Sequence, residues 1–352
     1  MRSVRCLSFL LTLFLFVLFS ASAQTYEQVQ TVLFYNCENL FDPADDPLKQ
    51  DDEFTPAGSR HWNSYRQYQK MVNLTKVIVD AGAGKAPALI GLAEVENDSV
   101  MQRLIHSTAL WPWEYRYVMT HSDDVRGINV ALLYQPYDFR LLSSESVKVN
   151  LPDGVRATRD LLHVCGRLVG GDTLDVIVCH LPSRMGGTRQ SAPKRKAAHQ
   201  ALRHLCDSLE RCRQHPHVLV MGDMNDSPDT RLLRRNMNFG GGLFNLMDSL
   251  QKNLRTGKAA FGTHKFQGKW SVLDQFWVNG NLLPGTRQVN AVPSETPRIW
   301  VDSIGVVCFP YMLVEDETHL GHRPKRTYSG YRYEGGFSDH LPIRLKLHII
   351  YK

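Results

Sequence analysis

Short runs of apolar residues recur along the chain and are separated by polar segments. Runs of this length and content predict buried β-strands. The runs are TVLFY from Thr31, ALIGLAEV from Ala88, NVALLY from Asn129, LLHVCGRLV from Leu161, LDVIVCHL from Leu174, VLVMGD from Val218, SVLDQFWV from Ser271 and LPIRLKL from Leu341. The sequence therefore predicts a protein in which strands dominate.

Helical periodicity is clearest in two segments. From Lys194 to Cys212, alanine, leucine and cysteine recur at intervals of three or four residues, as on the buried face of a helix. A second helix is predicted from Tyr65 to Val79, with Gly82 as its stop. Its apolar side would carry Tyr68, Met71, Val72 and Ile78.

The order of these elements indicates one α+β domain over residues 24–352. Helices are interspersed irregularly among the strands, and no linker rich in proline or serine divides them. A packed β-sandwich with helices outside fits this order. The longest irregular stretch covers residues 315–337 and is rich in glycine, arginine and tyrosine. Loops of that length are usually functional or disordered.

Residues 1–23 have the layout of a secretory signal peptide. Arg2 and Arg5 precede an apolar run, and Ala21-Ser22-Ala23 forms a small-residue cleavage site. We therefore expect cleavage near Ala23 and export to the periplasm or the medium. A retained membrane anchor is the alternative, but the run is short for a span. No later segment is apolar for long enough to cross a bilayer.

Composition adds little to this picture. The chain is 43% hydrophobic and 22% charged, which is ordinary for a globular protein and excludes disordered or collagen-like classes. Loss of the two leader arginines would lower the formal charge from +6 to +4. This mild excess is compatible with a polyanionic substrate without requiring one. No stable protein partner is evident, and the oligomeric state is left open.

Six cysteines remain once Cys6 is removed with the leader, and none has zinc-ligand spacing. Cys165 and Cys179 lie on two predicted strands around Gly170-Gly171, where a hairpin could pair them. Buried thiols are favoured over a disulfide. The pairing stays open.

Oxygen and imidazole ligands cluster where the predicted strands end. They are Asn36 and Glu38, Glu94 and Glu96, His180, Asp223 and Asn225, Asp274, and Asp339 with His340. Carboxylate and amide oxygens suit Mg²⁺, Mn²⁺ or Ca²⁺, whereas Zn²⁺ favours histidine and cysteine. A divalent cation beside two histidines suits hydrolysis of a phosphate ester, with histidine or aspartate activating water. We expect the strand ends to converge on one such site.

Seven motifs occur in a fixed order from about Thr31 to Leu347. They read FYNCENLFD, GLAEVEN, RGINVALLY, CHLPSRMGG, GDMNDSP, LDQFWV and FSDHLPI. Together they resemble an exported bacterial-type member of the endonuclease/exonuclease/phosphatase superfamily, which includes deoxyribonuclease I, abasic-site endonucleases, neutral sphingomyelinases and inositol-polyphosphate phosphatases. The resemblance implies a deoxyribonuclease I-like four-layered α/β/β/α sandwich of two mixed sheets. It also implies a metal-dependent phosphoric ester hydrolase.

The resemblance assigns a metal side and a water side to the site. Glu94 and Asn36 look like metal ligands, and Asp339 like a second-metal or supporting carboxylate. Mg²⁺ is the expected cofactor, with Mn²⁺ or Ca²⁺ as alternatives. Asp223 and Asn225 match a GDxN pair that positions the attacking water and contacts the phosphate.

The two histidines receive separate roles. Asp274 and His340 resemble the carboxylate–imidazole pair, in which the acid orients the ring. His180 resembles the second histidine of the nuclease and sphingomyelinase branches. Glu38 and Glu96 stay open between second ligands and solvated charges.

Basic residues after His180 are candidates for phosphate contact. The predicted phosphate-binding residues are Arg126, Ser183, Arg184 and Arg189. A helix that begins near Lys194 would add its positive end. Asp226, before Ser227-Pro228, is interpreted as a turn former.

The basic and tyrosine-rich segment that ends the long loop has two interpretations. Arg323, Lys325 and Arg326 alternate with Tyr328, Tyr331 and Tyr333. Such a segment could grip single-stranded nucleic acid, or the tyrosines could pin the loop to the sandwich. His319 and His322 are interpreted as surface residues.

Three functions follow from these residues. The first is an exported nuclease that hydrolyses phosphodiester bonds with a metal-bound phosphate and an Asp/His-activated water. The second is a sphingomyelinase-like, inositol or nucleotide phosphoesterase, and the third a catalytically silent metal-binding module. Gln275 and Cys179 depart from the family pattern beside Asp274 and His180, which leaves the substrate open. The sequence also does not decide between endo and exo cleavage or between one and two metals.

Overall fold

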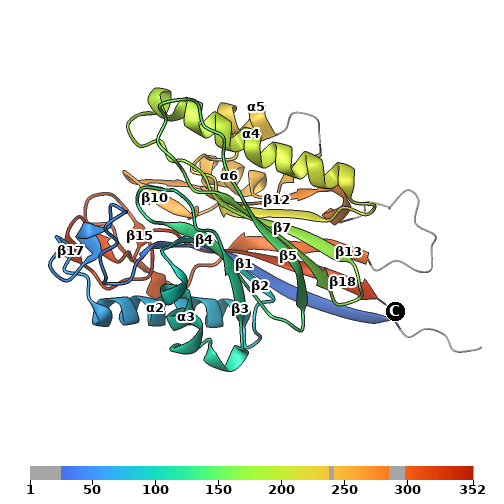
Figure 1. Cartoon of the computed structure of the whole chain (residues 1–352), viewed down its shortest axis with the longest axis horizontal. Helices are drawn as coiled ribbons and strands as arrows, with labels where there is room; N and C mark the ends of the chain where they lie inside the picture. The colour runs from blue at the N-terminus through green and yellow to red at the C-terminus, as the bar shows by residue number, and fades with distance from the viewer. Residues whose placement is uncertain (1–24, 238–241, 285–297, 352) are drawn as a thin grey trace, which may run out of the picture.

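The computed structural model describes residues 25–237, 242–284 and 298–351, so the predicted signal peptide lies outside the described residues. Two six-stranded mixed sheets pack face to face, and helices cover their outer faces (Figure 1). This arrangement confirms the four-layered sandwich. Among the described residues, no helix combines the length and the hydropathy needed to span a membrane.

The first sheet has the order β13-β18-β1-β2-β4-β3. Its strands are β13 (Arg298–Val306), β18 (Ile343–Tyr351), β1 (Tyr26–Leu40), β2 (Leu89–Val95), β4 (Asn129–Tyr134) and β3 (Arg116–Met119). β1 and β2 are parallel, and the other neighbours are antiparallel. Because parallel strands need a crossover connection, α2 (Ser64–Gly82) joins them. α3 (Asp98–His106) lies on the same side of the molecule (Figure 1).

The second sheet repeats this plan with the order β5-β6-β7-β8-β12-β9. Its strands are β5 (Phe139–Val147), β6 (Leu161–Leu168), β7 (Thr173–His180), β8 (Val218–Asp223), β12 (Asp274–Asn279) and β9 (Leu243–Asn245). β7 and β8 are parallel and are joined by α4 (Thr188–Cys212). Each sheet therefore contains one parallel pair with a helical crossover.

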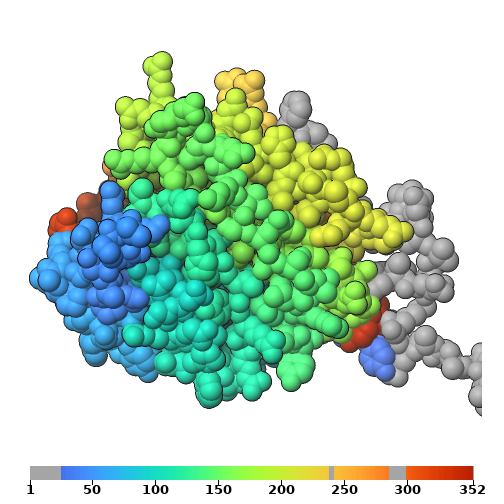
Figure 2. All heavy atoms as spheres, viewed as in Figure 1, coloured from blue at the N-terminus to red at the C-terminus, as the bar shows by residue number. Residues whose placement is uncertain are grey.

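Shorter elements lie at the end of the sandwich away from the C-terminus and on its flank. They are α5 (Arg231–Met237), α6 (Asp248–Arg255), β10 (His264–Phe266), β11 (Lys269–Ser271), β14 (Leu313–Glu315), β15 (His322–Pro324), β16 (Tyr328–Ser329) and β17 (Arg332–Tyr333). The blue segment after β1 and the orange-red segment before β18 adjoin at that end (Figure 2), where Arg60 donates to the carbonyl of Gly330.

The apolar runs of the central strands are continuous because both faces of these strands are buried. In β1, Val32 and Phe34 face the second sheet, whereas Leu33 and Tyr35 face the layer that contains α2. Strands covered on both sides carry no polar alternation. This explains why the runs are visible in the sequence.

Several predicted elements differ from the observed ones. One strand from Ser271 is wrong, because Ser271 ends the β10–β11 hairpin and β12 begins at Asp274. α4 begins at Thr188 and not near Lys194, since its first turns are exposed and lack apolar periodicity. The strands β3, β5 and β13 were not predicted.

The buried side of α2 matches the predicted one only in part. Met71 and Ile78 are buried as predicted, but Tyr68 and Val72 are exposed. The polar Gln67 and Lys70 are buried instead. Both polar side chains find interior partners, since Gln67 donates to the carbonyl of Phe41 at 3.2 Å and Lys70 to that of Phe337 at 3.3 Å. Hydrogen bonds of this kind offset the cost of burying polar groups, which apolar periodicity cannot predict.

The structure also shows how the predicted helix stop and the two cysteines are placed. Gly82 is the last helical residue, and Ala83 takes the left-handed capping position with φ 52°. Cys165 aligns with Asp175 across the β6–β7 pair and not with Cys179. Both cysteines are buried free thiols, as favoured from the sequence.

The contact between the two sheets is tight at Gly91 on β2. A Cβ atom at Gly91 would lie 2.5 Å from Sδ of Met221 on β8 and 3.1 Å from the ring of Phe34. Gly91→Ala should therefore lower the free energy of unfolding by about 1–3 kcal/mol, measured by urea denaturation. Gly305→Ala is the matched strand control, because nothing lies within 4 Å of its Cβ position.

A double mutant tests the cause of that loss. Met221→Ala alone should cost about 2–5 kcal/mol through the cavity it leaves. In Gly91→Ala/Met221→Ala the new methyl group has room, so the combined cost should be smaller than the sum by about 0.5–3 kcal/mol. Simple additivity would refute the proposed contact.

Candidate active site

The strand ends that carry the predicted residues meet at one edge of the sandwich. Asp223 at the end of β8 aligns with His180 on β7 and with Asp274 on β12. In the first sheet, Asn36 on β1 pairs with Ala93 on β2, directly before Glu94. The amide of Asn36 donates to Oδ2 of Asp223 at 3.1 Å, and this bond joins the two sheets. The predicted convergence is confirmed for these residues.

Four residues at this edge have left-handed backbone conformations. They are Glu38 (φ 50°), Asn39 (φ 57°), Glu94 (φ 60°) and Asn225 (φ 51°). Side chains other than glycine rarely adopt this region, and such residues concentrate at functional sites. At β1 the pairing with β2 shifts between Asn36 and Leu40, so the chain bends where the ligands are presented.

His340 and Asp274 form a buried pair. Nδ1 of His340 lies 2.7 Å from Oδ2 of Asp274, and its Nε2 lies 3.8 Å from Oδ2 of Asp223. Burial disfavours the charged ring, but Asp274 and Asp223 outweigh it and hold the pKa of His340 well above its ordinary value. The ring is therefore protonated at neutral pH and suits anion binding or proton donation.

Asp223 is the group whose pKa suits proton transfer from water. Burial raises its pKa to about 7, although His340 acts in the opposite direction. Its Oδ1 accepts the N–H of Asn225 at 2.8 Å, and the side-chain amide of Asn225 donates to the carbonyl of Leu181 at 2.8 Å. Asn225 is thereby fixed beside Asp223.

Glu94 and His180 form the opposite side of the site. Oε2 of Glu94 accepts the N–H of Asn39 at 2.9 Å and lies 3.6 Å from Arg126. Nε2 of His180 lies 3.8 Å from Glu94 and 3.6 Å from Asp223. Burial and then two arginines, Arg159 and Arg126, hold the pKa of His180 well below its ordinary value, so this ring is neutral.

The acidic and imidazole groups of this site could hold a divalent cation. Ligand atoms of Asp223, Asp274 and His340 lie within 4.8 Å of one another, as do those of His264, Asp339 and His340. Oδ1 of Asp274 is buried without a hydrogen-bond partner in the described chain, which is unusual for a carboxylate and fits a cation ligand. Glu94 shares no such group with Asp339 among the described residues. The ligand set of Asn36, Glu94 and Asp339 stays a prediction.

Of the predicted phosphate-binding residues, Arg126 lies beside Glu94, with Nη2 3.6 Å from Oε2. Arg184 instead directs its guanidinium at Asp226, with its Nε 2.9 Å from Oδ1. Ser183 accepts the N–H of Met185 at 3.3 Å, and Arg189 is exposed within α4. Lys194 lies inside α4, so the helix end predicted there is wrong.

Asp226 is not a simple turn former, because its side chain is fully buried. Arg195 on α4 contacts both of its carboxylate oxygens, and Arg184 contacts one. The amide of Gln275 donates to its main-chain carbonyl at 2.6 Å. Asp226 follows Asn225 directly. It therefore connects α4, β12 and the loop that follows β7 to the end of β8.

Glu38 and Glu96 have distinct surroundings. Oε2 of Glu38 accepts the N–H of Thr327 at 2.7 Å and lies 3.8 Å from the buried ammonium of Lys70. Glu96 accepts the N–H of Asp42 at 2.6 Å, and burial raises its pKa to about 8. Glu38 thus anchors the long loop to the end of β1.

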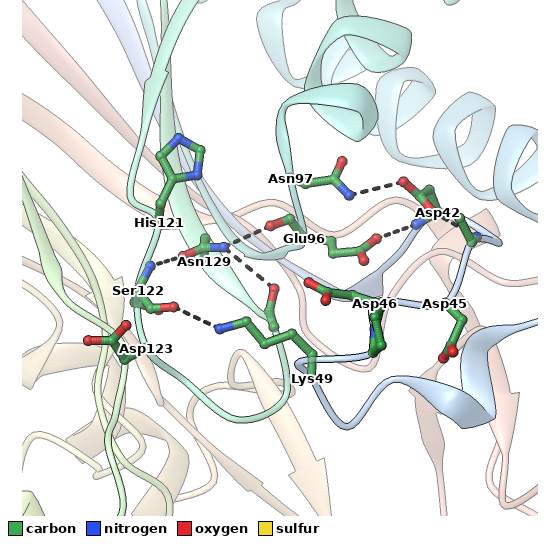
Figure 3. A pocket seen from close by; sticks show the side chains of 13 residues that line it. Asp42, Asp45, Asp46, Lys49, Glu96, Asn97, His121, Ser122, Asp123 and Asn129 are labelled. Atoms are coloured by element: carbon green, nitrogen blue, oxygen red, sulfur yellow. Dashed lines mark hydrogen bonds between the residues drawn. The ribbon is translucent and has the colours of Figure 1, made fainter.

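Glu96 lines a pocket of about 510 Å³ whose charged lining residues are acidic except for Lys49 (Figure 3). The acidic lining residues are Asp42, Asp45, Asp46, Glu96 and Asp123. The ammonium of Lys49, which also lines the pocket, donates to the carbonyls of Ser122 and Asp124 at 3.1 Å. The pocket thus disfavours anionic groups.

The tyrosine-rich segment is partly a structural anchor. Tyr328 is buried, packs on Trp62 with ring centroids 6.1 Å apart, and donates to the carbonyl of Arg60. Tyr331 is exposed, and the guanidinium of Arg60 lies 5.7 Å from its ring centroid. His319 is exposed beside Asp316, as expected from the sequence.

Removal of the Asp274 carboxylate should lower the pKa of His340 by about 1–3 units, because an opposite charge at hydrogen-bond distance stabilises the protonated ring. An NMR titration of the His340 imidazole in wild type and Asp274→Asn measures this shift. Asp175→Asn is the control, since it also removes a buried strand carboxylate but one that contacts His163 and Arg213 instead. An unchanged pKa in Asp274→Asn would contradict the assignment.

Comparison with known proteins shows to which family the chain belongs. The profile of the Endonuclease/Exonuclease/phosphatase family matches residues 31–349. A family member from Bacteroides thetaiotaomicron has TM-score 0.56 at 13% identity, over 94% of this chain and 97% of that one. No curated protein matches the sequence.

Two further solved structures share the fold. D. rerio TDP2 complexed with a single-strand DNA product has TM-score 0.54 at 14% identity, over 91% of this chain and 99% of that one. A mannosyl-6-phosphatase from Bacteroides thetaiotaomicron has TM-score 0.52 at 16% identity, over 90% and 99%. At this identity the structures support the fold alone, whereas the profile covers nearly the whole chain. The chain therefore belongs to the endonuclease/exonuclease/phosphatase family.

Proposed function

We propose that the chain is an exported, divalent-metal-dependent phosphoesterase of nuclease type, which hydrolyses phosphodiester bonds in DNA or RNA. The observation that carries this proposal is the position of Asp223, whose Oδ2 lies within 4 Å of the Nε2 atoms of both His180 and His340. Export is inferred from residues 1–23 alone.

The residues of the site divide the work of hydrolysis. Glu94, Asn36 and Asp339 would hold the cation, preferably Mg²⁺, which when bound neutralises charge on the phosphoryl and leaving oxygens. Asp223 would accept the proton of the attacking water, and Asn225 would orient the water and the phosphate.

The histidines complete the proposed mechanism. Protonated His340, oriented by Asp274, would donate from Nε2 to a phosphate oxygen. The neutral ring of His180 would hydrogen-bond a second oxygen or the leaving group. Arg126 would add a positive charge beside Glu94.

Two features favour nucleic acid as the substrate. Arg60 and the exposed Tyr331 offer a cation and an aromatic surface, and such pairs bind bases and backbone phosphates. The loop that carries Tyr331 is fixed to the site through the bond from Thr327 to Glu38. The TDP2 relative was solved with a DNA product, which supports the same substrate class here.

A small phosphate ester is the second candidate. The acidic pocket beside Glu96 would repel additional phosphates, which disfavours a polyanion on that side. The fold is also shared by a mannosyl-6-phosphatase. Inositol, nucleotide and sphingomyelin esters belong in the same test.

The test is hydrolysis by residues 24–352 of double-stranded DNA, single-stranded RNA, sphingomyelin, a nucleotide and a sugar phosphate, each with Mg²⁺ and with EDTA. We expect cleavage of nucleic acid that EDTA abolishes. Glu94→Gln and His340→Ala should each lower kcat/KM by about 10²–10⁴-fold, because they remove a cation ligand and a proton donor.

His319→Ala provides the control, since this histidine is exposed and pairs with Asp316 on the surface. Its activity should equal that of wild type. Turnover restricted to small esters or sphingomyelin would support the second candidate. Cleavage that persists in EDTA or in both site variants would refute the proposed mechanism.

A further inference from the structure

A third histidine, His264, lies at the edge of the proposed active site. It belongs to the β10–β11 hairpin, outside both six-stranded sheets. Its ring centroid lies 4.7 Å from that of His340, with the planes at 39°, and its Nε2 lies 3.9 Å from Oδ2 of Asp339. The side chain is 17% exposed, so part of it is open to solvent.

The backbone of His264 is fixed by the same contacts that fix the Asp274–His340 pair. The carbonyl of Thr263 accepts the N–H of Leu341 at 2.7 Å, and a β-bridge joins His264 to His340. Oγ1 of Thr263, a fully buried residue, accepts the N–H groups of Leu273 at 2.9 Å and Asp274 at 3.1 Å. The position of His264 relative to the pair is therefore set by hydrogen bonds, as a contact residue requires.

The ring nitrogens of His264 have no hydrogen-bond partner within the described residues. The 3.9 Å separation from Asp339 is too long for a hydrogen bond. His340 differs, because its Nδ1 is bound to Asp274. A fixed imidazole with free nitrogens, beside the ring of His340, can donate an N–H to an anionic oxygen.

We propose that His264 contacts the substrate and donates a ring N–H to a phosphate or leaving-group oxygen of an ester bound against His340. This inference rests on the proposed phosphoesterase function. His264 on the hairpin would then be the third imidazole of the site, beside His180 on β7 and His340 in the segment before β18.

His264→Phe tests the contact, because phenylalanine keeps the ring and removes both nitrogens. On a substrate that wild type cleaves, kcat/KM should fall by about 10- to 100-fold, as expected for a lost hydrogen bond to a charged group. His264→Gln, which retains an N–H donor, should recover part of the loss. Mg²⁺ affinity, measured by calorimetry, and the melting temperature should match wild type in both variants.

His319→Phe is the matched control, since it makes the same substitution at an exposed histidine that packs near Gly268 of the same hairpin. Its kcat/KM should be unchanged. Full activity in His264→Phe while His340→Ala is inactive would overturn the inference and leave the proposed function intact. Loss of Mg²⁺ affinity in His264→Phe would also overturn it, because His264 would then be a metal ligand.

A binding measurement keeps the inference testable without turnover. Inorganic phosphate with Mg²⁺ should shift the NMR signals of the His264 imidazole in wild type, and the His264→Phe variant should bind phosphate more weakly. Absence of both effects would overturn the inference. Absence of turnover with phosphate binding intact would refute the proposed function alone.

Discussion

The packing of β1 and β2 against β7 and β8 is the constraint on which the rest of this structure depends. Each pair is parallel and is connected by a helix, so the carboxyl ends of all four strands lie at one edge of the sandwich. Gly91 allows the sheets to approach, since any side chain there would meet Met221. The hydrogen bond from Asn36 to Asp223 then closes the gap between the sheets at the site. A shift of one sheet against the other would separate the groups that must act together.

The edge of the sandwich that carries the site buries charged groups that would otherwise lie in solvent. Asp223 and Asp274 are almost completely buried and face each other across neighbouring strands. Like charges at such short range are costly, and part of the cost is offset by His340, which is held protonated between them. A bound cation would offset more of it. The chain thus accepts local destabilisation where a phosphate is to be bound.

Contacts behind the site give these groups fixed positions. Asp226 accepts hydrogen bonds from Arg184 and Arg195, and these contacts fix the backbone that follows Asn225. On the other sheet, buried Lys70 lies beside Glu38 and reaches the loop that leads to Asp339. Neither contact involves the reacting atoms. Both keep strand ends and loops in register, which proximity catalysis requires.

The sequence alone determined the fold class, the central strands and the polar strand ends that meet at the candidate site. Strands buried on both faces leave continuous apolar runs, and their polar ends, from Asn36 to His340, stand out against them. The resemblance of GDMNDSP to a family motif identified Asp223 and Asn225 as candidate site residues. Edge strands such as β5 lack this contrast, because most residues of β5 are exposed and polar. They could not be found from apolar runs.

Only the tertiary structure decided where isolated polar residues lie. Arg184 pairs with Asp226, because α4 and the loop after β7 meet there. His264 belongs to a short hairpin with no periodic signal, and the bridge to His340 together with the hydrogen bonds of Thr263 brings it to the site. Local patterns record the burial of a segment, whereas contacts between distant segments depend on how the sheets and loops pack together.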